Sequence, residues 1–116
     1  PEEALSVFLR NLPLSEDPDL AKICHSGFCD LVESGKVDLN GLGSEVVRAA
    51  GEILAIVRDE DQDLATPETC SRVSQILVAI QNSPTSTIMA STFESLPDSS
   101  KSAIQDALNG TAAASP

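Results

Sequence analysis

Apolar residues recur every three or four positions along most of the chain, and prolines separate the segments in which they do so. Near the start, Leu5, Leu9 and Leu12 would share one face of a helix, and Pro13 would end it. The same spacing predicts six helices in all, over residues 2–12, 18–34, 44–58, 67–81, 84–94 and 98–109. No stretch alternates with the two-residue period of a half-buried strand, so the predicted fold class is all-α.

Prolines and capping residues mark several of the predicted helix starts. Pro18 falls in the first turn of the second helix, where its missing N–H has no partner to lose. Thr66, Pro67 and Glu68 match an N-cap, a first helical position and an acidic second position. The pair Ser83-Pro84 repeats this order and is expected to open the fifth helix.

Glycine and asparagine mark the predicted helix ends. Gly35 is the expected C-cap of the second helix, because glycine adopts the left-handed conformation without steric cost. Residues 40–43, Asn-Gly-Leu-Gly, are predicted to form a loop, and Asn109-Gly110 to end the last helix. The small and polar residues 110–116 have little to bury, so we expect them to form a disordered tail.

The predicted helices alternate in length, as paired helices of a repeat protein do. We therefore expect an α-solenoid of antiparallel helix pairs, about six helices with the last one as its C-terminal cap. No exact internal sequence repeat is visible, so periodicity alone also leaves a closed bundle open.

The composition points to a basic partner. The 116 residues include 7 Lys and Arg against 18 Asp and Glu, a formal net charge of −11. Such a field repels nucleic acid and anionic membrane surfaces, and it attracts cationic segments of other proteins. Aromatic residues are only 3% of the chain, too few to form a platform on which bases could stack.

Nothing in the sequence indicates export or a membrane span. No apolar run approaches the roughly 20 residues that a spanning helix needs. Three irregularly spaced cysteines do not form a disulfide framework, so we expect reduced, mostly buried thiols in a cytosolic or nuclear protein. The chain begins with proline, and we expect it to be a piece of a larger soluble protein.

The acidic run after the third helix resembles the start of a calcium-binding loop. Asp59, Asp61 and Asp63 match the first three ligand positions of an EF-hand. Leu64 stands where that loop requires glycine, and Cys70 where it requires a bidentate glutamate. The sequence therefore predicts a solvated linker here, with no calcium site.

Cys24, His25, Cys29 and Cys70 are the residue types of a zinc site, but their spacing does not suit one. Consecutive residues on a helix point about 100° apart, and residues five apart point about 140° apart. Cys24, His25 and Cys29 would therefore not converge on one tetrahedral ion. We predict no metal site.

Catalytic motifs are not evident either. His25 is the only histidine, and no G-x-S-x-G turn or glycine-rich phosphate loop is present. We expect a protein that is not an enzyme and that uses no cofactor.

One set of carboxylates stands out on the third predicted helix. Glu45, Glu52 and Asp59 are seven residues apart, and the helix drifts by only about 20° over each such step. The three side chains would form a stripe opposite the apolar face, facing solvent or a partner and partly neutralised by Arg48. The stripe is either an ordinary charged surface or a strip that holds lysines of a basic ligand. The candidate cargo-binding residues are Glu45, Glu52, Asp59, Asp61 and Asp63.

Several segments resemble the last HEAT repeats of importin-β-type nuclear transport receptors. Residues 8–14, FLRNLPL, are similar to the link in which an inner helix ends at Leu-Pro before the next outer helix. CDLVE at 29–33 and VVRAA at 46–50 resemble the next outer and inner helices. FESLP at 93–97 and IQDALN at 104–109 resemble the C-terminal cap. The similarity is greatest to the branch that imports histones and ribosomal proteins, the importin-four and importin-five receptors.

The resemblance implies a superhelix whose inner helices carry basic cargo between cytoplasm and nucleus. The third helix would be an inner one, which places Glu45, Glu52 and Asp59 near the cargo. The family grips Ran-GTP through N-terminal repeats that this chain lacks, so we expect no Ran site and a monomer. The acidic linker 59–63 and Gly51 inside an inner helix depart from the family pattern; Gly51 costs about 1 kcal/mol against alanine unless it permits close packing.

The sequence therefore predicts the cargo-binding C-terminal segment of an import receptor, specific for a basic segment of a histone or ribosomal protein. The alternative is a purely structural cap of a helical-repeat scaffold that touches no ligand.

Overall fold

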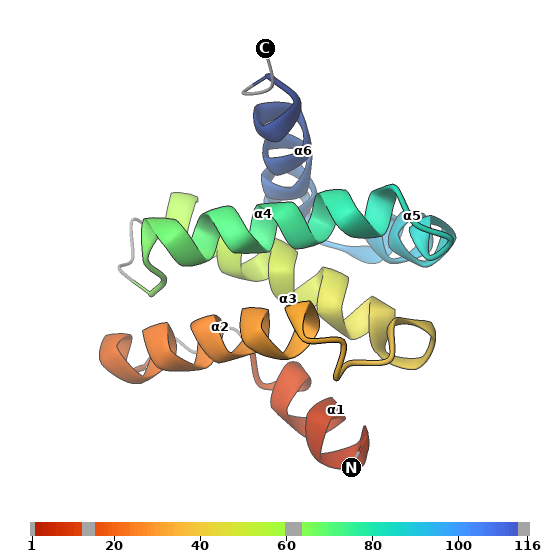
Figure 1. The fold of residues 1–116 in the computed structure, drawn as a ribbon. Coiled ribbons are helices and arrows are strands. Elements are labelled where there is room, and N and C mark those ends of the chain that lie inside the picture. Colours follow the sequence, from red (N-terminus) through yellow and green to blue (C-terminus); the bar gives the residue numbers. More distant parts are fainter. Residues whose placement is uncertain (1, 13–15, 60–63, 114–116) are drawn as a thin grey trace.

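Six helices form the fold in a computed structural model that describes residues 2–12, 16–59 and 64–113 (Figure 1). They are α1 (Glu2–Arg10), α2 (Pro18–Glu33), α3 (Leu39–Asp59), α4 (Pro67–Gln81), α5 (Ser86–Ser95) and α6 (Asp98–Ala113). The described residues contain no strand, so the predicted all-α class is confirmed.

α3 is the central helix, and α1, α4, α5 and α6 all pack against it. In Figure 1, α2 and α4 lie side by side in front of α3. The core between these helices is mainly aliphatic, with Phe28 as its one fully buried phenylalanine. Its largest fully buried apolar side chains are Leu9, Phe28, Val46, Val47, Ile53, Leu64, Val73, Leu77 and Ile104.

The outer helices α2 and α4 stack in parallel. His25 Nδ1 lies 2.8 Å from the carbonyl of Leu64, and the two residues are 39 positions apart. Glu33, two turns further along α2, meets Arg72 on α4, again 39 positions later. Because the contacts advance together along both helices, the helices run in the same direction. A separation near 40 residues is typical of equivalent helices in successive HEAT or armadillo repeats, so the fold has a helical-repeat arrangement.

The two outer helices also begin alike. Asp17 caps α2 by accepting hydrogen bonds from the backbone N–H groups of Asp19 and Leu20. Thr66 caps α4 by accepting one from the N–H of Thr69 at 3.1 Å. The predicted N-cap of the fourth helix is therefore confirmed, and a proline follows the cap in both helices.

The predicted loop at residues 40–43 is wrong, because α3 already begins at Leu39. The carbonyl of Asp38 accepts hydrogen bonds from the N–H groups of Gly41 and Leu42, at 3.1 and 2.7 Å. Leu42 is buried, and Gly43 packs closely on Ile88 of α5. Burial of this first turn outweighs the cost of about 1 kcal/mol that each helical glycine adds.

The predicted end of the last helix at Asn109-Gly110 is also wrong. α6 continues to Ala113, so residues 110–113 of the expected disordered tail are helical, and 114–116 fall outside the described residues. Gly110 stays helical, whereas Gly35 adopts a φ of 77° and ends α2 as predicted. Alanine is the best helix former, and the alanines after Gly110 favour continuation.

Two further boundaries differ by two residues each. α1 ends at Arg10, where the Asn11 side chain donates to the carbonyl of Val7 at 2.8 Å. α5 begins at Ser86 with Thr85 as its N-cap residue, so the pair Ser83-Pro84 does not open it. The Ser83 hydroxyl donates to the carbonyl of Ile80 at 2.7 Å and accepts from the N–H of Thr85.

Gly51 lets α3 and α6 approach closely. A β-carbon at this position would lie 2.8 Å from Cδ1 and 3.1 Å from Cγ1 of Ile104. Ile104 is fully buried, so its side chain has little room to move away. The glycine therefore serves close packing.

Candidate functional site

The two described carboxylates of the predicted stripe are paired with Arg48 on the same helix. The Arg48 guanidinium forms a short ion pair with Glu52 and lies 3.7 Å from the Glu45 carboxylate. The side chains of Glu45 and Glu52 are only 31% and 34% exposed. The partial neutralisation by Arg48 that the spacing predicts is therefore confirmed.

Arg48 also joins α3 to the end of α1. Its Nη2 donates to the carbonyl of Leu9 at 2.6 Å, and its Nη1 to the carbonyl of Leu12 at 3.0 Å. The last carbonyls of a helix lack intrahelical partners and carry the negative end of its dipole, so a guanidinium is well matched to them. Sequence spacing shows the pairs with Glu45 and Glu52, but it gives no signal for contacts 36 and 39 residues away.

The same carboxylates line a surface recess between α3 and α5 of about 440 Å³. Ser44 and the stripe residues form one wall, and Ser91, Thr92 and Ser95 of α5 form the other. Glu45 Oε2 is buried there, with no hydrogen-bond donor among the described residues. α5 packs beside this part of the stripe, so Glu45 and Glu52 reach solvent only in part, through the recess.

The remaining candidates lie at and beyond the end of α3. Asp59 is the last residue of that helix, and its side chain is not among those described. Asp61 and Asp63 lie outside the described residues altogether. Their assignment to cargo binding stays a prediction.

Two other arginines join helices in the same way as Arg48. Arg58 of α3 reaches Asp106 of α6 at 2.5 Å, and Arg72 of α4 holds Asp30 and Glu33 of α2 at 2.6 and 2.7 Å. The hydrogen bond from Arg72 lowers the pKa of Glu33, so that carboxylate stays ionised at neutral pH. Arg48, Arg58 and Arg72 are thus all engaged between helices.

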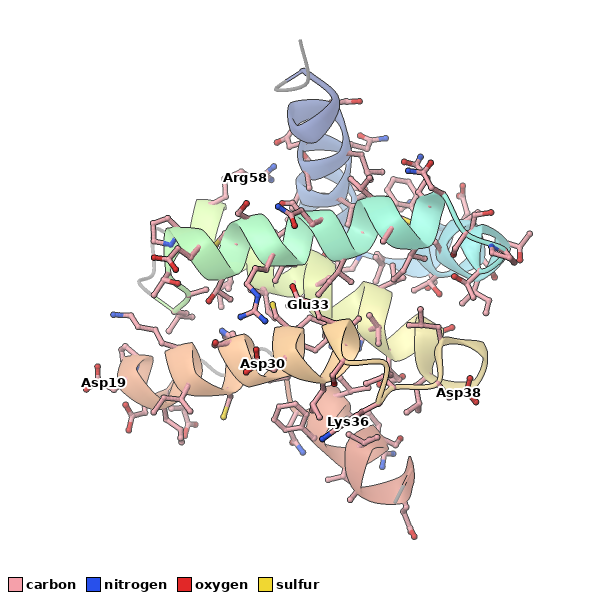
Figure 2. All side chains as sticks on the ribbon, viewed as in Figure 1. Asp19, Asp30, Glu33, Lys36, Asp38 and Arg58 are labelled. Atoms are coloured by element: carbon pink, nitrogen blue, oxygen red, sulfur yellow. The ribbon has the colours of Figure 1, made fainter. Side chains whose placement is uncertain are left out.

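Other carboxylates extend from the surface. Figure 2 shows Asp19 near the start of α2, with Asp30 and Glu33 further along the same helix. Apart from those paired with Arg58 and Arg72, the exposed acidic side chains of the described residues are Glu3, Glu16, Asp17, Asp19, Asp38, Glu68, Glu94 and Asp98. The acidic surface is therefore wider than the predicted stripe.

His25 and Cys29 are buried in the core, and Cys24 and Cys70 are partly buried against it. Cys29 is buried, which raises the pKa of its thiol to about 11, and burial also raises the pKa of the Cys70 thiol. Protonated thiols are poor nucleophiles and poor metal ligands. Among the described residues, no three His, Cys, Asp or Glu side chains lie close enough together to hold a metal ion.

His25 makes stability depend on pH. Its ring is fully buried, and desolvation lowers its pKa below 6.5. The unfolded chain therefore binds a proton at a higher pH than the folded one. The contribution of the neutral His25 to stability is complete above about pH 6.5 and is lost as pH falls.

We expect the unfolding free energy of the wild type, relative to His25→Gln, to decrease between pH 7 and 5 in urea titrations. Parallel curves for the two proteins over that range would contradict this assignment.

Comparison with known proteins gives no relative: no family model, curated protein or solved structure matches this chain. Within the described part of the chain, no helix is both long enough and apolar enough to cross a membrane.

Proposed function

We propose that this chain is the cargo-binding C-terminal segment of a nuclear import receptor of the importin-β type. In this function it would bind a Lys- and Arg-rich segment of a histone or ribosomal protein and accompany it from cytoplasm to nucleus. The carboxylates at the end of α3 and in the linker after it, Asp59, Asp61 and Asp63, would take the largest share of the binding.

The observation that carries this proposal is the acidic surplus together with the position of the arginines. The formal net charge is −11, and Arg48, Arg58 and Arg72 are engaged between helices. These cations neutralise carboxylates within the fold and leave other carboxylates at the surface. Such a surface attracts basic segments at long range and repels nucleic acid.

The parallel stacking of α2 and α4 supports a protein of the helical-repeat class. Helical-repeat proteins present extended surfaces to peptides and to unfolded segments of other proteins. Exposed ion pairs contribute only about 0–1 kcal/mol each, so useful affinity needs several carboxylates acting together or contacts along a longer array of repeats.

Binding of a fluorescent Lys- and Arg-rich peptide tests the proposal. We expect the quadruple variant Glu52→Gln, Asp59→Asn, Asp61→Asn and Asp63→Asn to bind about tenfold more weakly or worse, because it removes four negative charges and little side-chain volume. The matched control neutralises Glu3, Glu68, Glu94 and Asp98 instead, and is expected to change affinity much less. Equal weakening by both sets would contradict a localised site and leave only non-specific attraction.

A purely structural role is the second candidate, and Arg48 favours it. The ion pairs of Arg48 with Glu45 and Glu52 hold α3 against α1, which is a stabilising function that needs no ligand. Charge reversal of these glutamates would place lysines beside Arg48 and lower stability whichever role is correct. The quadruple amide variant does not introduce this repulsion. If it binds the peptide as tightly as the wild type does, the structural role is favoured.

A further inference from the structure

An apolar groove runs along the second half of α4, on its side nearest the end of α2. The groove has a volume of about 710 Å³. Its accessible apolar side chains are the half-buried Val32 of α2 and Leu39 of α3 and the exposed Ala79 of α4. Ile76 and Ile80 of α4 form its floor and are themselves buried in the core. The Glu33 side chain stands at its edge.

The groove exists because α2 stops before α4 does. His25 lies beside Leu64 and Glu33 beside Arg72, so α2 covers α4 only as far as about Arg72. Gly35, with a φ of 77°, then turns the chain away towards α3. The groove therefore borders α4 from Gln75 onward and continues to Ser83, just after the helix ends.

Acidic side chains predominate at the α2 edge of the groove. Glu33 lines this edge, and Asp30 lies about one turn earlier on α2. Arg72 pairs with both carboxylates and balances only one of their two charges. Lys36 extends from the end of α2 on the side away from α4 (Figure 2). An occupant that places cations beside its apolar face would complement this edge.

We propose that the groove binds an amphipathic helix of a partner protein, with its apolar face on Val32, Leu39 and Ala79 and with Lys or Arg beside Glu33. Docking an amphipathic helix into an apolar groove is a recurrent mode of recognition. A second copy of this chain is disfavoured as occupant because two molecules of net charge −11 repel each other. The inference rests on the proposed function for the basic character of the partner, and adds that the partner is also apolar and helical.

The test uses a labelled helical peptide of about 15 residues, with leucines at i, i+4, i+7 and i+11 and lysines flanking them. The protein variant is Ala79→Lys, which places a long cationic side chain in the groove from an exposed helical position. The matched control is Gln81→Lys, which adds the same charge at an exposed position of the same helix outside the groove. Thermal unfolding of both variants checks that the fold is kept.

We expect Ala79→Lys to weaken peptide binding about tenfold or more, and Gln81→Lys to change it by less than about twofold. Equal effects of the two variants would overturn the proposal. If a peptide with serines in place of the leucines binds equally tightly, the proposal that the groove binds an apolar helix face is overturned. The proposed binding of basic segments would not be affected by that result. If a peptide with glutamates in place of the lysines binds equally tightly, the proposal that the partner is basic is overturned. Self-association in sedimentation that Ala79→Lys abolishes would assign the groove to a second copy and contradict the proposal.

Discussion

Replacing Arg48 with methionine is expected to lower the free energy of unfolding by about 2–4 kcal/mol. The substitution keeps an apolar stem of similar length but removes the donors to the carbonyls of Leu9 and Leu12. Hydrogen bonds that involve a charged group contribute about 1.5–3 kcal/mol each. The Leu9 carbonyl lies in the last turn of α1, and the Leu12 carbonyl two residues after the helix ends. The variant also leaves Glu45 and Glu52 close together without their cation. Urea unfolding followed by circular dichroism measures the loss.

Arg10→Met is the matched control. Arg10 is exposed, and its Nε reaches only the Ser6 carbonyl of its own helix, at 3.4 Å. We expect its loss to change stability by no more than about 0.5 kcal/mol. Adding Glu45→Gln and Glu52→Gln to Arg48→Met should restore part of the stability, because the repulsion between the two carboxylates disappears. If the methionine variants at 48 and 10 unfold alike, Arg48 does not hold α1 to α3.

Gly51→Ala is expected to destabilise the protein by up to about 2 kcal/mol, although helix propensity alone predicts the opposite sign. Alanine is favoured over glycine inside a helix by about 1 kcal/mol. Against this, the new methyl group would lie 2.8 Å from Cδ1 of the fully buried Ile104. Overpacking of a filled core costs about 1–3 kcal/mol, which outweighs the propensity gain. Thermal and urea unfolding measure the net effect.

Gly27→Ala provides the control, because a β-carbon at Gly27 in α2 would have no atom within 4 Å. Here only propensity acts, and the expected change is a stabilisation of about 0.5–1 kcal/mol. Ile104→Val removes the colliding Cδ1 and should recover part of the loss when combined with Gly51→Ala. Stabilisation by alanine at both glycines would show that α3 and α6 are not closely packed at this point.

Local sequence signals are sufficient to predict most of the helices. The cap at Thr66 and the left-handed Gly35 act within one turn of the residues they affect, so they are readable without the fold. The first turn of α3 could not be predicted, because its glycines are compensated by burial of Leu42 and by contact of Gly43 with Ile88. α6 continues beyond Gly110, which stays helical. A glycine in the sequence therefore does not predict a helix end unless it adopts the left-handed conformation.

The candidate site is predictable only in part, for the same reason. The spacing of Glu45, Arg48 and Glu52 on one helix is sufficient to predict their pairing. The contacts of Arg48 with Leu9 and Leu12, and the packing of α5 beside the stripe, join residues far apart in sequence. The groove along α4 depends on where α2 ends relative to α4, which is a property of the stacking and has no local signal.

The most direct measurement of the central claim is the dissociation constant of a Lys- and Arg-rich peptide over a series of salt concentrations. Attraction between exposed charges is screened within about 10 Å at 0.1 M ionic strength, so the account predicts affinity that falls steeply and continuously as salt increases. An affinity that is the same at low and high salt would show that charge does not drive binding, and it would contradict the assignment of this acidic helical-repeat segment as a receptor for basic proteins.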